Sequence, residues 1–186
     1  MTEQLSSLAL QALAIVEESG AIISANHAHP HTIRHKGRID LVTETDIAVE
    51  AFLKERLAAL TPGAGFLAEE SAEDLRLPDT CWIIDPVDGT TNFAHGLPLT
   101  VTSVAYRLNG ETVLGIINAP LLRECYIAEK GKGAWRNGER ISVSSVAACE
   151  NALVATGFPY EIARRVDEIL KRIRPVLSSC QGVRRC

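Results

Sequence analysis

The sequence has no excess of basic residues and no apolar run long enough to cross a membrane. Its 186 residues carry 19 Lys and Arg against 23 Asp and Glu, a formal net charge of -4. Nucleic-acid binding needs clustered Lys and Arg, so we do not expect a nucleic acid as a partner. The early apolar run, 8–16, is shorter than the roughly 20 residues that a bilayer requires, and acidic residues flank it. We therefore expect no membrane partner.

Closely spaced cysteine pairs are missing as well. No Cys-x-x-Cys occurs, and the number of cysteines is odd, which argues against a disulfide framework. A reducing compartment fits this pattern best, and we expect the protein in the cytoplasm. The five cysteines are widely spread: Cys81, Cys125, Cys149, Cys180 and Cys186.

The remaining composition is that of a packed soluble protein. Apolar residues make up 46% and charged residues 23% of the chain, near the averages of globular domains. The length suffices for one full domain and part of a second. We predict a first domain over 1–150 and the start of a second over 151–186, where a strand at 152–156 precedes a helix at 162–177.

Hydrophobic periodicity predicts two helices followed by a sheet. Apolar residues recur at helical spacing from 5 to 23, and Asn26 stops the pattern. Thr45 and Asp46 can cap a second helix that ends near 61–63. Tight turns between the later strands predict an antiparallel meander, and two helices against such a sheet form an α+β layer. The expected strands are 65–68, 81–84, 101–108, 113–118 and 124–129, with hairpin turns at Asn109-Gly110 and Asn137-Gly138.

The most informative stretch is an apolar strand that runs into two carboxylates, Asp85 and Asp88. Clustered carboxylates repel one another unless they are protonated or bridged by a cation. Mg²⁺ fits, because it takes oxygen ligands and keeps phosphate oxygens in its shell, and the Val87 carbonyl and Thr90 hydroxyl would be further ligands. Gly89 lets the backbone approach an anion, so metal and substrate phosphate can share this loop. The alternative is two turns and a capped helix without a ligand.

Three more acids belong to the same hypothesis. Glu69 and Glu70 end the predicted strand at 65–68, and one of them can face the Asp85 loop because neighbouring strand residues point to opposite faces. A Glu-Glu pair alone would be surface charge. Asp46 needs no explanation beyond a helix cap, but it can also accept a hydrogen bond from Thr90 and help to deprotonate a water.

These segments resemble the inositol monophosphatase family, part of a larger group that includes fructose-1,6-bisphosphatases and bisphosphate nucleotidases. The match covers essentially the whole chain. It is carried by GFLAEES at 65–71, DPVDGTTNF at 85–93, GIINAP at 115–120, EKGKGAWRNG at 129–138 and VRR at 183–185.

The resemblance implies a fold, an activity and a partner. The fold would be the layered α/β/α/β/α sugar-phosphatase fold of the α+β class, with the helix pair and antiparallel sheet of a metal-binding phosphatase domain in 1–150. Its second α/β domain would be truncated in 151–186. The activity would be Mg²⁺-dependent hydrolysis of a small phosphorylated sugar or inositol, with inositol monophosphate as leading substrate and water as nucleophile. A homodimer is expected.

The same resemblance assigns the ligands and catalytic residues. Glu69, Asp85, the Val87 carbonyl and Thr90 would hold one Mg²⁺, Asp85 and Asp88 would share a second, and a third ion would lie near Glu69 and Glu70. The substrate-binding residues would be Asp88, Gly89 and Thr90. The catalytic residues would be Thr90, Asp46 and Glu70.

One departure from the family lowers the expected activity. The family takes a further metal-binding aspartate from a Trp-Asp segment beyond the position of Arg185, and we expect this chain to be a weak or inactive phosphatase without it.

The alternative functions are a metal-binding remnant or interaction protein of the same fold, a bisphosphate nucleotidase and a fructose-1,6-bisphosphatase. An acidic calcium module is disfavoured, because no EF-hand spacing is present. The histidines between His27 and His35 suggest adventitious metal binding in a loop.

Overall fold

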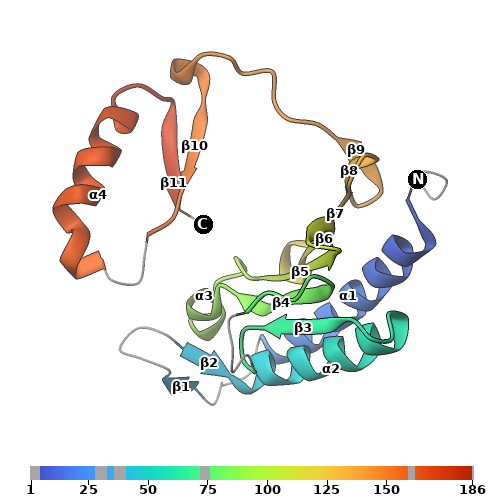
Figure 1. Ribbon diagram of the computed structural model, residues 1–186. Coiled ribbons are helices and arrows are strands. Elements are labelled where there is room, and N and C mark those ends of the chain that lie inside the picture. The colour runs from blue at the N-terminus through green and yellow to red at the C-terminus, as the bar shows by residue number, and fades with distance from the viewer. Residues whose placement is uncertain (1–4, 28–32, 36–40, 72–75, 159–161, 186) are drawn as a thin grey trace. The chain divides into compact units, whose positions relative to one another are not determined.

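The computed structural model of the chain describes residues 5–27, 33–35, 41–71, 76–158 and 162–185. Contacts divide the chain into two compact units, Met1–Ile141 and Ser142–Cys186, and each is described by itself (Figure 1). The predicted domain boundary at residue 150 stays a prediction, since a division by contacts does not test where a functional domain ends.

The first helix, α1, spans Ser7–Asn26 and confirms the predicted one. It begins where the Ser6 side chain accepts a hydrogen bond from the Ala9 N–H at 3.1 Å. Among the described residues, α1 is the one helix long and apolar enough to cross a membrane, a test that core helices also pass. Its apolar face lies in the core, where Ala12, Val16 and Ile23 are fully buried.

The second helix, α2, spans Glu44–Leu60, and its cap differs from the prediction. Thr43 is the N-cap, and Asp46 is the third helical residue, which closes a capping box with it. The expectation that Thr45 and Asp46 are the caps was therefore wrong in register. The reason is that a Thr-x-x-Asp spacing satisfies two orphan N–H groups at once. A short antiparallel pair, β1 (Ile33–His35) and β2 (Leu41–Thr43), leads into α2.

A seven-stranded sheet forms the body of the first unit, in the order β3-β4-β5-β6-β7-β8-β9. The pairs from β4 to β9 are antiparallel, and Asn109 and Asn137 adopt the positive φ angles that the predicted hairpin turns require. The strands are β3 (Gly65–Ala68), β4 (Cys81–Asp88), β5 (Val101–Leu108), β6 (Glu111–Ala119), β7 (Glu124–Glu129), β8 (Gly133–Arg136) and β9 (Glu139–Ile141).

The first strand of the sheet departs from the predicted meander, because β3 runs parallel to β4. Ala68 pairs with Ile84, so both strands end at the same edge of the sheet. The intervening segment, 69–80, is long enough for the crossover that a parallel pair needs. This pairing decides the geometry of the site, since each of the two strands ends in acids.

The core lies between the sheet and the two long helices (Figure 1). Buried residues alternate with more exposed ones along β5 and β6, so the buried residues share one face of the sheet. Examples are Val104 and Tyr106 of β5 and Leu114 and Ile116 of β6. This face packs with the buried residues of α1 and α2 in a single apolar cluster. The period-two burial confirms an α+β layer with one sheet face covered by helices.

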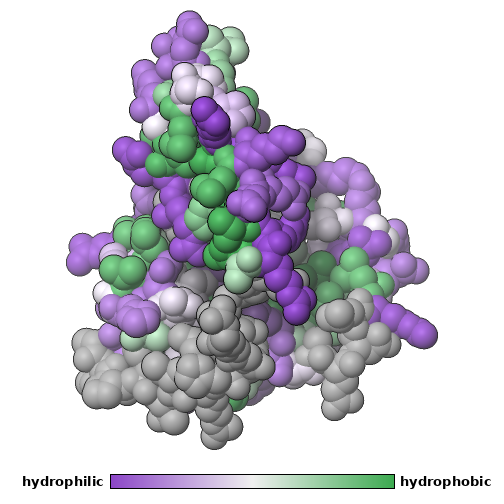
Figure 2. Space-filling model, turned by 90° about the vertical axis from the view of Figure 1, so that its left-hand side faces the viewer, coloured by the Kyte–Doolittle hydropathy of each residue, from purple (hydrophilic) through white to green (hydrophobic). Residues whose placement is uncertain are grey.

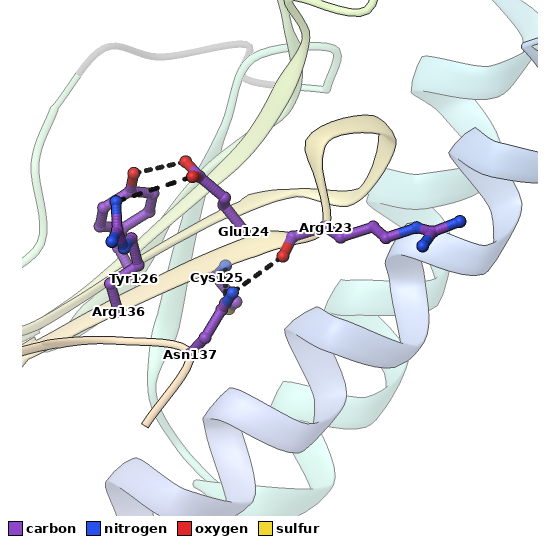
Figure 3. Close-up of polar contacts among 6 residues, drawn as sticks. All are labelled: Arg123, Glu124, Cys125, Tyr126, Arg136 and Asn137. Carbon is purple, nitrogen blue, oxygen red and sulfur yellow. Dashed lines mark hydrogen bonds and ion pairs between the residues drawn. The ribbon is translucent and has the colours of Figure 1, made fainter. Parts of the chain in front are cut away.

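A polar cluster ties the last hairpin to β7 (Figure 3). The Asn137 side chain accepts a hydrogen bond from the Cys125 N–H at 2.8 Å and donates one to the Arg123 carbonyl at 2.9 Å. Beside it, the Tyr126 hydroxyl donates to the Glu124 carboxylate at 2.6 Å. The Asn137 side chain therefore satisfies the Cys125 N–H and the Arg123 carbonyl beside the β8–β9 turn.

The second unit contains a parallel strand pair joined through a helix. Strand β10 (Leu153–Thr156) pairs with β11 (Gly182–Arg185), and α4 (Ile162–Leu177) connects them. In Figure 2, which looks onto the side of α4, apolar side chains lie between polar ones. The exposed apolar residues of α4 are Ile162, Val166, Leu170 and Leu177.

Three short helical segments complete the described part of the chain: α3 (Thr90–Ala94), η1 (Pro120–Leu122) and η2 (Cys149–Asn151). Of the predicted histidine cluster, His27 is the C-cap residue of α1 and His35 ends β1. His29 and His31 lie outside the described residues.

Candidate active site

The end of β4 contains a β-bulge around its two aspartates. Asp85 pairs with Ser103 and Asp88 with Val101, so one extra residue stands on the β4 side. Pro86 has no N–H to donate, and its carbonyl accepts the Thr102 hydroxyl at 3.0 Å. The bulge breaks the alternation of the strand between Asp85 and Asp88.

Gly89 connects the bulge to α3 in a conformation that side chains rarely adopt. Its φ is +91°, and a Cβ atom here would lie 2.7 Å from the Leu99 carbonyl oxygen. Glycine is therefore needed at position 89 because its φ is positive and because its backbone lies against the Leu99 carbonyl. The residue that follows, Thr90, begins α3.

The Thr90 hydroxyl lies within hydrogen-bond distance of two acceptors. Its Oγ1 is 2.9 Å from the Val87 carbonyl oxygen and 3.2 Å from Asp46 Oδ1. The Asp46 side chain is 1% exposed, and its other oxygen accepts from the N–H and the hydroxyl of Thr43. The contact between Asp46 and Thr90 that a catalytic role requires is present, while the role itself stays a proposal.

Asp85 is the electrostatic centre of the acids. Burial, together with the neighbouring Glu69 and Asp88 carboxylates, raises the pKa of Asp85 to about 8. Its Oδ1 atom is buried and has no hydrogen-bond partner. A carboxyl in this state keeps a proton at neutral pH unless a cation takes the place of the proton.

The acids do not stand in a closed chelating arrangement. Among the residues that the structure describes, no three His, Cys, Asp or Glu side chains are grouped so that they could hold an ion. Glu69 lies beside Asp85, and its carboxylate helps to raise the pKa of Asp85. Glu69 and Asp88 are exposed, so a rotation of their side chains can redirect their oxygens.

The β3 end is held from two sides. The Glu69 N–H donates to the Ile84 carbonyl at 3.1 Å, and the Glu70 N–H donates to Glu50 Oε2 at 2.8 Å. Sequence reasoning missed Glu50, although its position four residues after Asp46 on the same helix was a usable signal. Thr102 and Thr43 were missed as well, since neither lies in the acidic motifs.

The residues around Asp85 fit a hard divalent cation such as Mg²⁺. The available donors are all oxygens: the carboxylates of Glu69, Asp85 and Asp88, the Val87 carbonyl and the Thr90 hydroxyl. The observation that tests the fit is the buried, unpartnered Oδ1 of Asp85, because a cation supplies the partner that this oxygen lacks.

The chain has a layered α+β fold, and its acids gather at the sheet edge where two parallel strands end. These two features define the class of protein to which it belongs. The chain belongs to the inositol monophosphatase family, whose model matches residues 4–186.

Relatives agree with this assignment. The chain is 42% identical over 154 residues to an inositol monophosphatase of Dictyostelium discoideum. The matched segment covers 81% of this chain and 57% of the relative. The chain is 41% identical to a fructose-1,6-bisphosphatase/inositol-1-monophosphatase of Thermotoga maritima, over 73% of this chain and 54% of the relative. The chain thus spans little more than half of these two proteins.

A solved structure shows the same fold. The extragenic suppressor protein suhB of Bartonella henselae superposes with a TM-score of 0.90 at 31% identity, over 97% of this chain and 70% of that one. The predicted sugar-phosphatase fold is therefore confirmed.

Proposed function

We propose that the protein hydrolyses a small phosphate monoester in a Mg²⁺-dependent reaction, with inositol monophosphate as the leading substrate. The observation that carries the proposal is Asp85, whose pKa is raised to about 8 by burial and by two neighbouring carboxylates and whose Oδ1 has no partner. Perturbed carboxyls gathered at a strand end are typical of functional sites. Membership of the inositol monophosphatase family supports the substrate class.

Under this proposal, Glu69, Asp85, the Val87 carbonyl and Thr90 would hold one Mg²⁺ ion, and Asp85 and Asp88 would hold a second. Glu69 and Glu70 would lie near a third. Bound Mg²⁺ would supply an acidified water and would neutralise charge on the phosphate and the leaving oxygen. The chain contributes the fixed spacing of the backbone segments that carry these residues, through the bulge in β4 and the pairing of β3 with β4.

The proposed proton path uses Thr90 and Asp46. Asp46 Oδ1 accepts the Thr90 hydroxyl proton, which leaves the lone pairs of Thr90 Oγ1 directed at the attacking water. The buried carboxylate of Asp46 is fixed by Thr43, so its Oδ1 keeps its place beside the Thr90 hydroxyl. Asp88, Gly89 and Thr90 are the proposed binding residues for the substrate phosphate. Glu70 is the third proposed catalytic residue, with Thr90 and Asp46.

Fructose 1,6-bisphosphate is the second candidate substrate. The Thermotoga maritima relative, at 41% identity, carries both activities in its name. Its name alone favours this substrate over the nucleotide bisphosphates.

A phosphate-release assay tests the proposal. Purified protein is incubated with inositol 1-phosphate, fructose 1,6-bisphosphate and adenosine 3',5'-bisphosphate, with Mg²⁺ and then with EDTA. We expect weak release from inositol 1-phosphate that EDTA abolishes and added Mg²⁺ restores. Release that EDTA leaves unchanged would overturn the metal-dependent mechanism, and release from the nucleotide alone would overturn the substrate class. Asp85→Asn serves as the control for contaminating phosphatases.

A further inference from the structure

Helix α2 buries two acids on its core face, one turn apart. Asp46 is 1% exposed and Glu50 is 4% exposed, and residues at i and i+4 of a helix lie on the same face. Like charges at this spacing destabilise a helix, and a buried carboxylate is costly unless it is hydrogen-bonded or paired. The capping box accounts for Asp46 within the helix, whereas no cap accounts for a buried acid at position 50.

Each of the two acids holds the end of a different strand. Asp46 Oδ1 accepts from the Thr90 hydroxyl, which follows β4, at 3.2 Å. Glu50 Oε2 accepts from the Glu70 N–H, which follows β3, at 2.8 Å. Charge-assisted hydrogen bonds of this kind are about twice as strong as neutral ones. The helix therefore spans both acidic segments of the site.

Lys54 extends the contact by one more turn of α2. Its ammonium donates to the Ser71 hydroxyl at 2.8 Å and lies 3.9 Å from Glu50 Oε1. The segment 69–71 is thus held by α2 at two places, while the Ser71 N–H also donates to the Ala68 carbonyl at 3.3 Å. A cation beside Glu50 offsets part of the cost of burying its charge.

We infer that Glu50 is a positioning residue for the metal site. Its carboxylate holds the Glu70 backbone, and α2 thereby fixes the spacing between the Glu69-Glu70 segment and Asp85. The inference rests on the proposed function, since it takes Glu69 and Asp85 as ligands of one ion. Glu50 is not itself among the proposed ligands of the metal.

Substitutions at Glu50 separate positioning from general stability. Glu50→Ala removes the acceptor and should weaken Mg²⁺ binding by about 10-fold or more, the range found when partners of metal ligands are removed. Glu50→Gln keeps a side-chain carbonyl for the Glu70 N–H and loses only the charge beside the half-exposed Lys54, so it should keep the Mg²⁺ dissociation constant within about 3-fold. Both are measured by titration calorimetry without substrate, at a temperature where circular dichroism shows the variant folded.

Thr61→Val is the matched control. It removes a hydrogen bond of 2.7 Å from the Trp82 indole N–H at the other end of α2, away from the acids. We expect this variant to lose thermal stability and to bind Mg²⁺ as the unchanged protein does. Equal loss of Mg²⁺ affinity in Thr61→Val and Glu50→Ala would overturn the inference in favour of a general stability effect.

The Glu70 amide proton gives a readout that does not depend on the metal. In ¹⁵N-resolved NMR spectra of the protein in EDTA, its resonance should move upfield in Glu50→Ala and should largely keep its position in Glu50→Gln. An unmoved Glu70 resonance in Glu50→Ala would overturn the inference, as would an equal loss of Mg²⁺ affinity in both Glu50 variants. An unchanged protein that binds no Mg²⁺ would overturn the proposed function, and the amide shift would still decide whether Glu50 holds this backbone.

Discussion

Asp85 differs from the other acids of the site in its surroundings. It is half-buried between two carboxylates and has an unpartnered oxygen, whereas Asp88 is exposed. We predict that Asp85→Asn weakens Mg²⁺ binding by about 10-fold or more and that Asp88→Asn weakens it less, because Asp85 is proposed to bridge two ions. Calorimetric Mg²⁺ titrations of the two variants measure this. Equal losses in the two variants would contradict the bridging role.

Thr90 and Asp46 are expected to act as one unit. We predict that Thr90→Ala and Asp46→Asn each lower kcat by about 100-fold or more, the scale of a lost proton-transfer group. The double variant should be little worse than either single one, because both residues act on the same water. Steady-state kinetics of the double-mutant cycle measure the coupling.

Thr91→Ala is the control for that cycle. Thr91 is exposed and lies next to Thr90 in the same short helix. Its kcat should match that of the unchanged protein. Additive effects of Thr90→Ala and Asp46→Asn would count against a shared proton path.

At the scale of elements, the turn from β4 into α3 depends on Gly89. We predict that Gly89→Ala lowers the free energy of unfolding by more than about 2 kcal/mol, because strain at positive φ, on the order of 1–2 kcal/mol, adds to a clash with the Leu99 carbonyl. Gly63→Ala is the matched control, since its φ is +90° but no atom lies within 4 Å of the added Cβ. Urea unfolding of both variants measures the difference. Equal destabilisation would show that the Leu99 contact is irrelevant.

At the scale of the whole molecule, the acids link stability to pH and to Mg²⁺. The pKa of Asp85 is raised from 3.8 to about 8 in the folded chain, so between these pH values the folded state binds more protons than the unfolded state. The contribution of Asp85 to stability in EDTA is therefore present at low pH and is lost as pH rises towards 8. Mg²⁺ must displace this proton, so it should raise Tm more at pH 8 than at pH 6.

Thermal unfolding from pH 5 to pH 8, with EDTA or with Mg²⁺, measures this linkage. Asp85→Asn cannot titrate at this position, and the difference between it and the unchanged protein isolates Asp85 from other groups. A difference in Tm that does not vary with pH in EDTA would contradict the raised pKa.

Much of the fold could be predicted because its signals are local. The spacing of apolar residues predicted α1, and the Asn-Gly pairs predicted the turns at Asn109 and Asn137, whose positive φ angles favour these residues. The cap of α2 was misplaced, since Thr43 and Thr45 are both suitable caps and only the contact with Asp46 distinguishes them. Four acids of the candidate site, Glu69, Glu70, Asp85 and Asp88, were visible as residue types at strand ends, whereas Glu50 on α2 was missed.

By itself, the sequence determined the family, the α+β class and which oxygens are available to a cation. Only the tertiary structure decided how these oxygens meet. The parallel pairing of β3 with β4 brings Glu69 beside Asp85, whereas an antiparallel pair would have put them at opposite ends of the strands. The raised pKa of Asp85 and the role of Glu50 likewise depend on burial and on contacts between distant segments. The pairing of β3 with β4 and the burial of Asp85 arise from contacts between distant segments, and no local pattern of residues encodes them.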